Sequence, residues 1–107
     1  MAEFAHESEA QVAGLLAGYG IRWEYEPTTF VLETDADGNV VEAFTPDFYL
    51  PDFDTYVEVT TMRQSLVTKK NRKVRRLAEV HPGVRIKLLY RRDIEHLGSK
   101  YGLADAA

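Results

Sequence analysis

The sequence predicts a mixed α/β domain, in which one helix precedes antiparallel hairpins and a second helix crosses over to a last strand. Three observations lead to this prediction. Apolar residues recur at helical spacing near the start of the chain, they alternate as in strands through its middle, and a His-Pro-Gly sequence separates a second helical segment from another alternating one. With 107 residues, 45% of them hydrophobic, the chain is long enough for one domain with one modest core.

The first helix is predicted from about Glu3 to Tyr19, and Gly18 and Gly20 mark its end. Its apolar residues form one stripe: Phe4, Val12, Leu15, Leu16 and Tyr19. A strand is expected over Ile21–Glu26, because Pro27 follows it and has no N–H to continue a strand ladder.

Two hairpins are predicted next. The segments Phe30–Thr34 and Val40–Phe44 flank Asp-Ala-Asp-Gly-Asn, a composition typical of a turn. The segments Asp47–Leu50 and Tyr56–Val59 flank a second turn around Pro51–Asp54.

The last third of the chain is expected to be helix, strand and short helix. The helix lies within Gln64–Val80 and ends before Pro82. The segment Val84–Tyr90 alternates apolar and basic residues as a strand does, and Asp93–Leu97 is a short helical turn. The whole chain is expected to form a single domain, with a weakly structured tail from about residue 98.

Several classes of protein are excluded on composition. The chain has no cysteine and therefore neither disulfides nor a thiolate metal site. The first residues are acidic and lack the apolar run of a signal peptide, and no window approaches the roughly 18 apolar residues of a membrane span. We expect a cytoplasmic protein.

The net charge of −4 conceals two opposite halves. Residues 1–60 carry 13 Asp and Glu against one Arg, whereas residues 61–107 carry 12 Lys and Arg against 4 acids. Two explanations are open: packed faces that neutralise each other, or an acidic metal centre beside a basic surface that binds a polyanion.

The second hairpin places two carboxylates face to face. If it turns about Asp52 and Phe53, Asp47 lies opposite Glu58. Alternation then assigns one apolar face: Phe48, Leu50, Val57 and Val59. The other face holds Asp47, Tyr49, Tyr56, Glu58 and Thr60.

Two like charges about 5 Å apart repel each other and destabilise a hairpin unless something neutralises them. A divalent cation such as Mg²⁺ or Mn²⁺ would do so, because Mg²⁺ prefers carboxylate oxygens and keeps positions for water and phosphate. The alternative is a solvated face whose charges protect an edge strand from aggregation.

The residues Thr-Pro-Asp-Phe (45–48) and Tyr-Val-Glu-Val (56–59) resemble the PD-(D/E)XK nuclease superfamily, which has the restriction-endonuclease-like αβββαβ core. The resemblance covers roughly residues 3 to 90. It implies that Asp47 and Glu58 bind the metal and act in catalysis. It also implies that a glutamate on the first helix assists, for which Glu9 is the candidate; the other interpretation of Glu9 is an ordinary solvated glutamate.

Position 60 departs from the family pattern, because Thr60 stands where the motif has lysine. A threonine hydroxyl supplies no positive charge, so three outcomes are open. Thr60 itself works beside the metal, as in very-short-patch repair endonucleases; a lysine reaches the site from another element; or the site is inactive. Helical spacing puts Lys70 on the inward face with Val67, Val74, Leu77 and Ala78, and makes it the predicted replacement, with Lys69 and Lys73 behind it. The alternative is that the Lys70 side chain extends past Leu77 to solvent.

The basic helix is the predicted nucleic-acid-binding element: Lys69, Arg72, Lys73, Arg75 and Arg76. Its alternative role is a solvated face that balances the acidic half. Aromatic residues that stack on bases, or instead belong to the core, are Trp23, Tyr25, Tyr49 and Tyr56.

The resulting hypothesis is a metal-dependent nuclease that hydrolyses phosphodiester bonds in DNA or RNA, with DNA as the favoured substrate. A homodimer or larger complex would supply sequence specificity. The alternative function is an inactive nuclease-fold module that binds nucleic acid or a protein partner.

Overall fold

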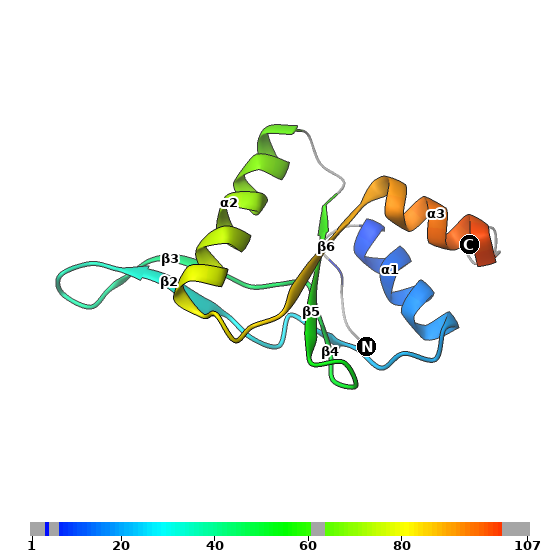
Figure 1. The fold of residues 1–107 in the computed structure, drawn as a ribbon, viewed down its shortest axis with the longest axis horizontal. Coiled ribbons are helices and arrows are strands. Elements are labelled where there is room, and N and C mark those ends of the chain that lie inside the picture. The colour runs from blue at the N-terminus through cyan, green and yellow to red at the C-terminus, as the bar shows by residue number, and fades with distance from the viewer. Residues whose placement is uncertain (1–3, 5–6, 61–63, 102–107) are drawn as a thin grey trace.

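The computed structural model describes residues 4, 7–60 and 64–101 (Figure 1). Along the chain the elements are α1 (Glu7–Gly18), β1 (Glu24–Tyr25), β2 (Phe30–Thr34), β3 (Val40–Phe44), β4 (Phe48–Leu50), β5 (Thr55–Thr60), α2 (Gln64–Val80), β6 (Ile86–Tyr90) and α3 (Arg91–Tyr101). The prediction of a mixed α/β domain is confirmed.

The central sheet has four strands in the order β1-β4-β5-β6. The pairs β1–β4 and β4–β5 are antiparallel, while β6 is parallel to β5, so α2 is the crossover between them. Phe48 pairs with Val57 and Tyr49 with Tyr56, which confirms the predicted register of the second hairpin. That register fixes which side chains of β4 and β5 share a face.

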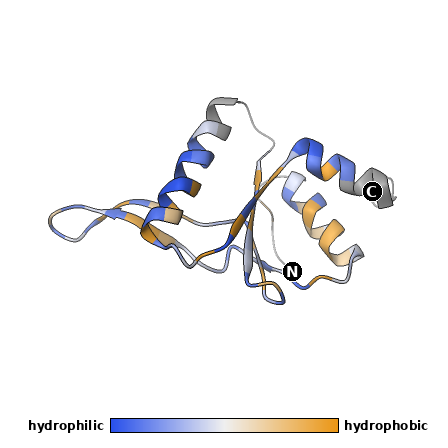
Figure 2. Cartoon of the chain, viewed as in Figure 1, coloured by the Kyte–Doolittle hydropathy of each residue, from blue (hydrophilic) through white to orange (hydrophobic). Residues whose placement is uncertain are grey.

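One face of the sheet packs against α1 and α3, which lie side by side in Figure 1. Its core contains the apolar face predicted for the hairpin: Phe48, Leu50, Val57 and Val59. The helices contribute Val12, Ala13, Leu15, Leu16 and Ile94. Figure 2 shows the contrast between α1, which is largely hydrophobic, and α2, which is hydrophilic along most of its length.

A second, smaller core lies between α2 and the separate β2–β3 hairpin, which extends away from the sheet in Figure 1. It consists of Leu32, Phe44 and the fully buried Leu77. The hairpin has the predicted bounds. Its turn uses Gly38 at a φ of 85°, a left-handed conformation that glycine adopts without strain.

Several boundaries differ from the prediction: α1 begins at Glu7 rather than about Glu3, β4 at Phe48 rather than Asp47, and β6 at Ile86 rather than Val84. The strand expected over Ile21–Glu26 is only two residues long, and Glu26 has a φ of 47°, so the chain leaves the extended conformation before Pro27. The last helix begins at Arg91 rather than Asp93, with the Asp93 carboxylate accepting a hydrogen bond from the Tyr90 N–H at 2.8 Å. Helix α3 also continues through Tyr101, past the start of the expected weak tail, whereas residues 102–107 lie outside the described residues.

Candidate functional site

Asp47 and Glu58 lie together on the face of the sheet opposite α1, and both are buried, at 7% and 4% exposure. Each carboxylate accepts a hydrogen bond from the backbone of the opposite strand. Glu58 Oε1 accepts from Asp47 N–H at 3.0 Å, and Asp47 Oδ2 accepts from Val59 N–H at 2.8 Å. The solvated-edge alternative is therefore wrong for these two side chains, which are fixed in place by the strands that carry them.

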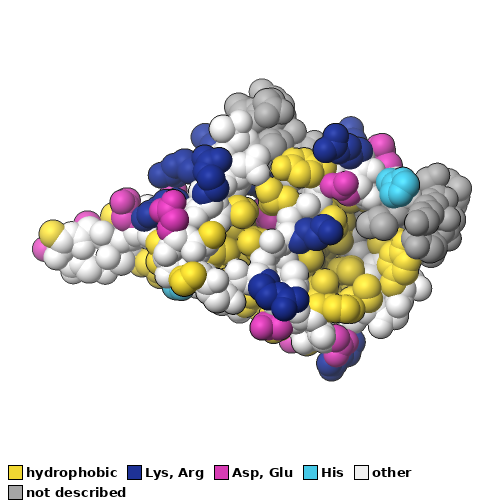
Figure 3. Space-filling model, viewed as in Figure 1, with side chains coloured by type: hydrophobic (Ala, Val, Ile, Leu, Met, Phe, Trp, Pro, Cys, Tyr) yellow, Lys and Arg dark blue, Asp and Glu magenta, His cyan; other side chains and the backbone are white. Residues whose placement is uncertain are grey.

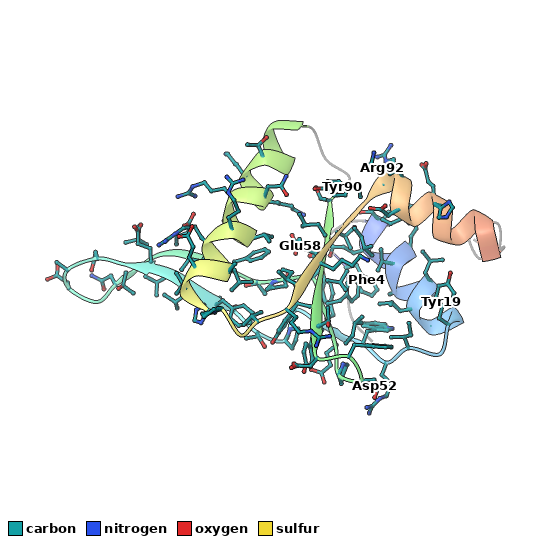
Figure 4. The ribbon with its side chains drawn as sticks, in the orientation of Figure 1. Phe4, Tyr19, Asp52, Glu58, Tyr90 and Arg92 are labelled. Carbon is teal, nitrogen blue, oxygen red and sulfur yellow. The ribbon has the colours of Figure 1, made fainter. Side chains whose placement is uncertain are left out.

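Lys70 reaches this pair from α2. Its Nζ lies 2.9 Å from Glu58 Oε2 and 2.6 Å from the Val59 carbonyl oxygen. Figure 4 shows the Glu58 side chain between β5 and α2, the helix that carries Lys70. The prediction that Lys70 lies on the inward face of α2 is confirmed, and its partner there is a carboxylate.

The helical face predicted for α2 is correct in part. Leu77 is fully buried and Val74 half-buried, but Ala78 is exposed, because the small core beneath α2 covers a narrower stripe than expected. The Val67 side chain lies outside the described residues.

The site carries more negative than positive charge. Burial, then the charge of Glu58 and to a lesser extent that of Glu9, raises the pKa of Asp47 from 3.8 to about 7, although the Val59 N–H and Lys70 oppose the shift. Burial also raises the pKa of Glu58, against the opposing effect of Lys70 and the hydrogen bonds. Lys70 thus pairs with Glu58, while Asp47 makes no ion pair with a cation among the described residues, so a further cation beside the two acids would be stabilised.

Glu9 is buried on α1 at 4% exposure, so its interpretation as a solvated glutamate is wrong. The Tyr25 hydroxyl donates a hydrogen bond to Glu9 Oε1. Its charge acts on Asp47, yet among the described residues no three His, Cys, Asp or Glu side chains gather as a metal-binding group. In this structure Glu9 is thus held by Tyr25, and its role as a third metal ligand stays a prediction.

Thr60 is buried at 2% exposure at the end of β5. Its Oγ1 is the one buried side-chain oxygen or nitrogen without a hydrogen-bond partner in the part of the chain that the structure describes. The Thr60 hydroxyl is thus a buried polar group without a hydrogen bond, and it does not offset the negative charge of Asp47 and Glu58.

Replacement of this hydroxyl is expected to stabilise the metal-free protein. In Thr60→Val a methyl group takes the place of the unpaired Oγ1, so we expect the free energy of unfolding to rise by about 1 kcal/mol. Urea denaturation measures it, with Thr55→Val as the control, because the Thr55 hydroxyl donates to the Phe53 carbonyl at 2.9 Å and its loss is expected to destabilise. A Thr60→Val variant less stable than wild type would contradict the expectation.

The basic residues of α2 do not form one open surface. Arg72 pairs with Glu42 at 2.6 Å, Lys73 Nζ donates to the Ala43 carbonyl at 3.0 Å, and Arg76 donates to the Leu32 carbonyl at 3.0 Å. These contacts attach α2 to the β2–β3 hairpin. Because Arg72, Lys73 and Arg76 already have partners there, not all five predicted residues are free to bind phosphate. Figure 3 shows Lys and Arg side chains over α2 with acidic side chains beside them, as mutual neutralisation of the two halves requires.

Two members of the predicted cluster remain available. Lys69 and Arg75 are exposed, and within the described ranges neither has a hydrogen-bond or ion-pair partner. Arg72 keeps a 59% exposed side chain beyond its contact with Glu42. A polyanion approaching α2 would therefore meet these three residues first.

The aromatic residues divide between two faces. Trp23 and Tyr25 pack against Phe48 in the main core, at centroid distances of 5.5 and 5.6 Å. Tyr49 and Tyr56 stack at 4.7 Å on the face that carries Glu58. Of the four aromatics predicted as core or base-stacking residues, Trp23 and Tyr25 are therefore core.

Sequence reasoning missed two contributors to the site. The Val59 carbonyl is aimed at the cation position, but nothing in a side-chain pattern marks a backbone oxygen. Tyr25 is predicted as a base-stacking or core residue, but its hydroxyl also donates a hydrogen bond to Glu9, which the sequence did not indicate. No local signal links two residues 16 positions apart on different elements.

Comparison of the chain with models of protein families, with curated proteins and with solved structures returned no match. Among the described residues, no helix has both the length and the apolar character needed to cross a membrane.

Proposed function

We propose that the protein is a Mg²⁺- or Mn²⁺-dependent nuclease of the PD-(D/E)XK type. The observation that carries the proposal is the pair of buried carboxylates, Asp47 and Glu58, beside the ammonium of Lys70, which contacts Glu58. Two carboxylates and the Val59 carbonyl are hard oxygen donors, which suit Mg²⁺ and Mn²⁺. The residues present therefore fit the ion that the resemblance implies.

The connectivity supports the same proposal. With the β2–β3 hairpin and the C-terminal α3 set aside, the elements run α1, β1, β4, β5, α2 and β6, which is the order αβββαβ. Asp47 directly precedes β4 and Glu58 lies within β5, as the first and second acids of the motif would.

Each residue has a role that follows from its position. Asp47 and Glu58 would hold the cation, which when bound lowers the pKa of a water and stabilises charge on the phosphate. Lys70 would supply the positive charge that Thr60 lacks, orienting the attacking water or offsetting the phosphate charge. Lys69, Arg72 and Arg75 would contact the nucleic-acid backbone, which favours binding without reading sequence.

The test is cleavage by the wild-type protein. Labelled single- and double-stranded DNA and RNA are incubated with Mn²⁺, Mg²⁺, Ca²⁺ or a chelator. We expect cleavage of DNA with Mn²⁺ or Mg²⁺ and none with the chelator. Equal cleavage with and without chelator would contradict the proposed mechanism.

The second candidate is an inactive module of the same fold that binds nucleic acid or a protein partner. This candidate is favoured by the contacts of Lys70 with Glu58 and the Val59 carbonyl. An ion pair that only stabilises the fold would have the same geometry. In that case Mn²⁺ would neither bind nor support cleavage, while nucleic acid or a partner would still bind.

A further inference from the structure

The ammonium of Lys70 occupies a defined position between two oxygen atoms of consecutive residues of β5. It donates to Glu58 Oε2 at 2.9 Å and to the Val59 carbonyl at 2.6 Å. Among the residues that the structure describes, Lys70 makes no other hydrogen bond or ion pair, and its side chain is 21% exposed. The position is therefore polar, negatively charged and connected to solvent along the lysine side chain.

The same oxygens are those that a metal ion at this site would use. A Mg²⁺ ion binds oxygen at about 2.0–2.1 Å, so an ion held by Glu58 and Val59 would overlap the present ammonium position. Two cations that close to each other repel strongly in a buried site. An ion and the ammonium cannot both contact Glu58 Oε2 and the Val59 carbonyl as Lys70 does here.

We infer that Lys70 is the resident cation of the metal-free site, and that a divalent ion must displace its ammonium from Glu58 and Val59. This inference rests on the proposed function and adds that the metal ion and the Lys70 ammonium compete for the same two oxygen atoms. In the metal-free protein Lys70 compensates buried charge; after displacement its ammonium is free to meet an incoming phosphate. Lys70, which the proposed mechanism needs for catalysis, would therefore also lower the affinity of the site for the metal ion.

The competition is measured by calorimetric titration of Mn²⁺ into wild type, Lys70→Met and Lys87→Met at one pH. Methionine keeps much of the lysine stem without the charge. We expect Lys70→Met to bind Mn²⁺ at least about tenfold more tightly than wild type, a difference of about 1.4 kcal/mol. Lys87→Met is the matched control, since Lys87 is exposed on β6 and outside the site; its Mn²⁺ affinity should equal that of wild type.

A second measurement needs no variant. In wild type, acetylation of lysines is followed by mass spectrometry with and without Mn²⁺. Lys70 should be protected in the metal-free protein, because its ammonium is held by two acceptors, and Mn²⁺ should increase its labelling relative to Lys69. This experiment remains informative if Lys70→Met does not fold.

The outcomes separate the inference from the proposed function. The competition is overturned if folded Lys70→Met binds Mn²⁺ no more tightly than wild type does. It is also overturned if bound Mn²⁺ leaves the labelling of Lys70 in wild type unchanged. Either result leaves the nuclease proposal standing. Absence of Mn²⁺ binding by both wild type and folded Lys70→Met overturns both.

Discussion

Replacing Asp47 by asparagine, or Glu58 by glutamine, is expected to lower the rate of Mn²⁺-dependent cleavage roughly 10³-fold. The amides keep the shape of the side chains and an oxygen to accept the hydrogen bonds from Val59 N–H and Asp47 N–H. They remove the negative charge that would hold the cation. The loss should thus be one of metal binding and catalysis, measured by single-turnover cleavage and calorimetry on folded protein.

The matched control is Asp52→Asn, at the turn of the same hairpin. Asp52 is exposed and pairs with Arg22, so this variant removes one carboxylate without touching the site. We expect its cleavage rate to stay within about threefold of wild type, because exposed ion pairs contribute little. Full activity in both Asp47→Asn and Glu58→Gln would disprove the two-carboxylate mechanism.

The stability of the metal-free protein is expected to fall as the pH rises from about 4 to about 7. The pKa of Asp47 is raised from 3.8 to about 7 in the folded protein, and that of Glu58 is raised as well. Between these pH values the folded state holds a proton that the unfolded state has released, so raising the pH favours unfolding. The part due to Asp47 is fully present below about pH 4, is lost by about pH 7, and amounts to at most roughly 4 kcal/mol.

Urea denaturation in a chelator across this pH range measures the effect, and Asp47→Asn should flatten the profile, since asparagine does not titrate. Adding Mn²⁺ at pH 8 should restore stability, because the ion binds the ionised carboxylates of the folded state. An Asp47→Asn profile as steep as that of wild type would show that another group causes the dependence.

The sequence was sufficient for the parts of the fold that depend on local pattern. Alternation and turn chemistry predicted the β4–β5 register that brings Asp47 and Glu58 together. Helical periodicity predicted that Lys70 points inward, and the structure adds its partner, Glu58. These features follow from the repeat of side-chain direction within one helix or strand, which can be read from residues close in sequence.

The rest depends on contacts between distant elements. Arg72 pairs with Glu42, thirty residues away, and its charge alone did not distinguish this pairing from phosphate binding. Glu9 looked equally suited to solvent and to the site, and its burial follows from the packing of α1 on the sheet. The Val59 carbonyl contributes to the site through the backbone, which no residue type marks.

The attachment of the β2–β3 hairpin to α2 has a mechanical consequence. Arg72, Lys73 and Arg76 tie the hairpin to the helix that also carries Lys70, two to six residues before them. The hairpin and the helix also pack against each other through the small core of Leu32, Phe44 and Leu77. A displacement of the projecting hairpin would therefore act on α2, the element that holds the Lys70 ammonium beside Glu58.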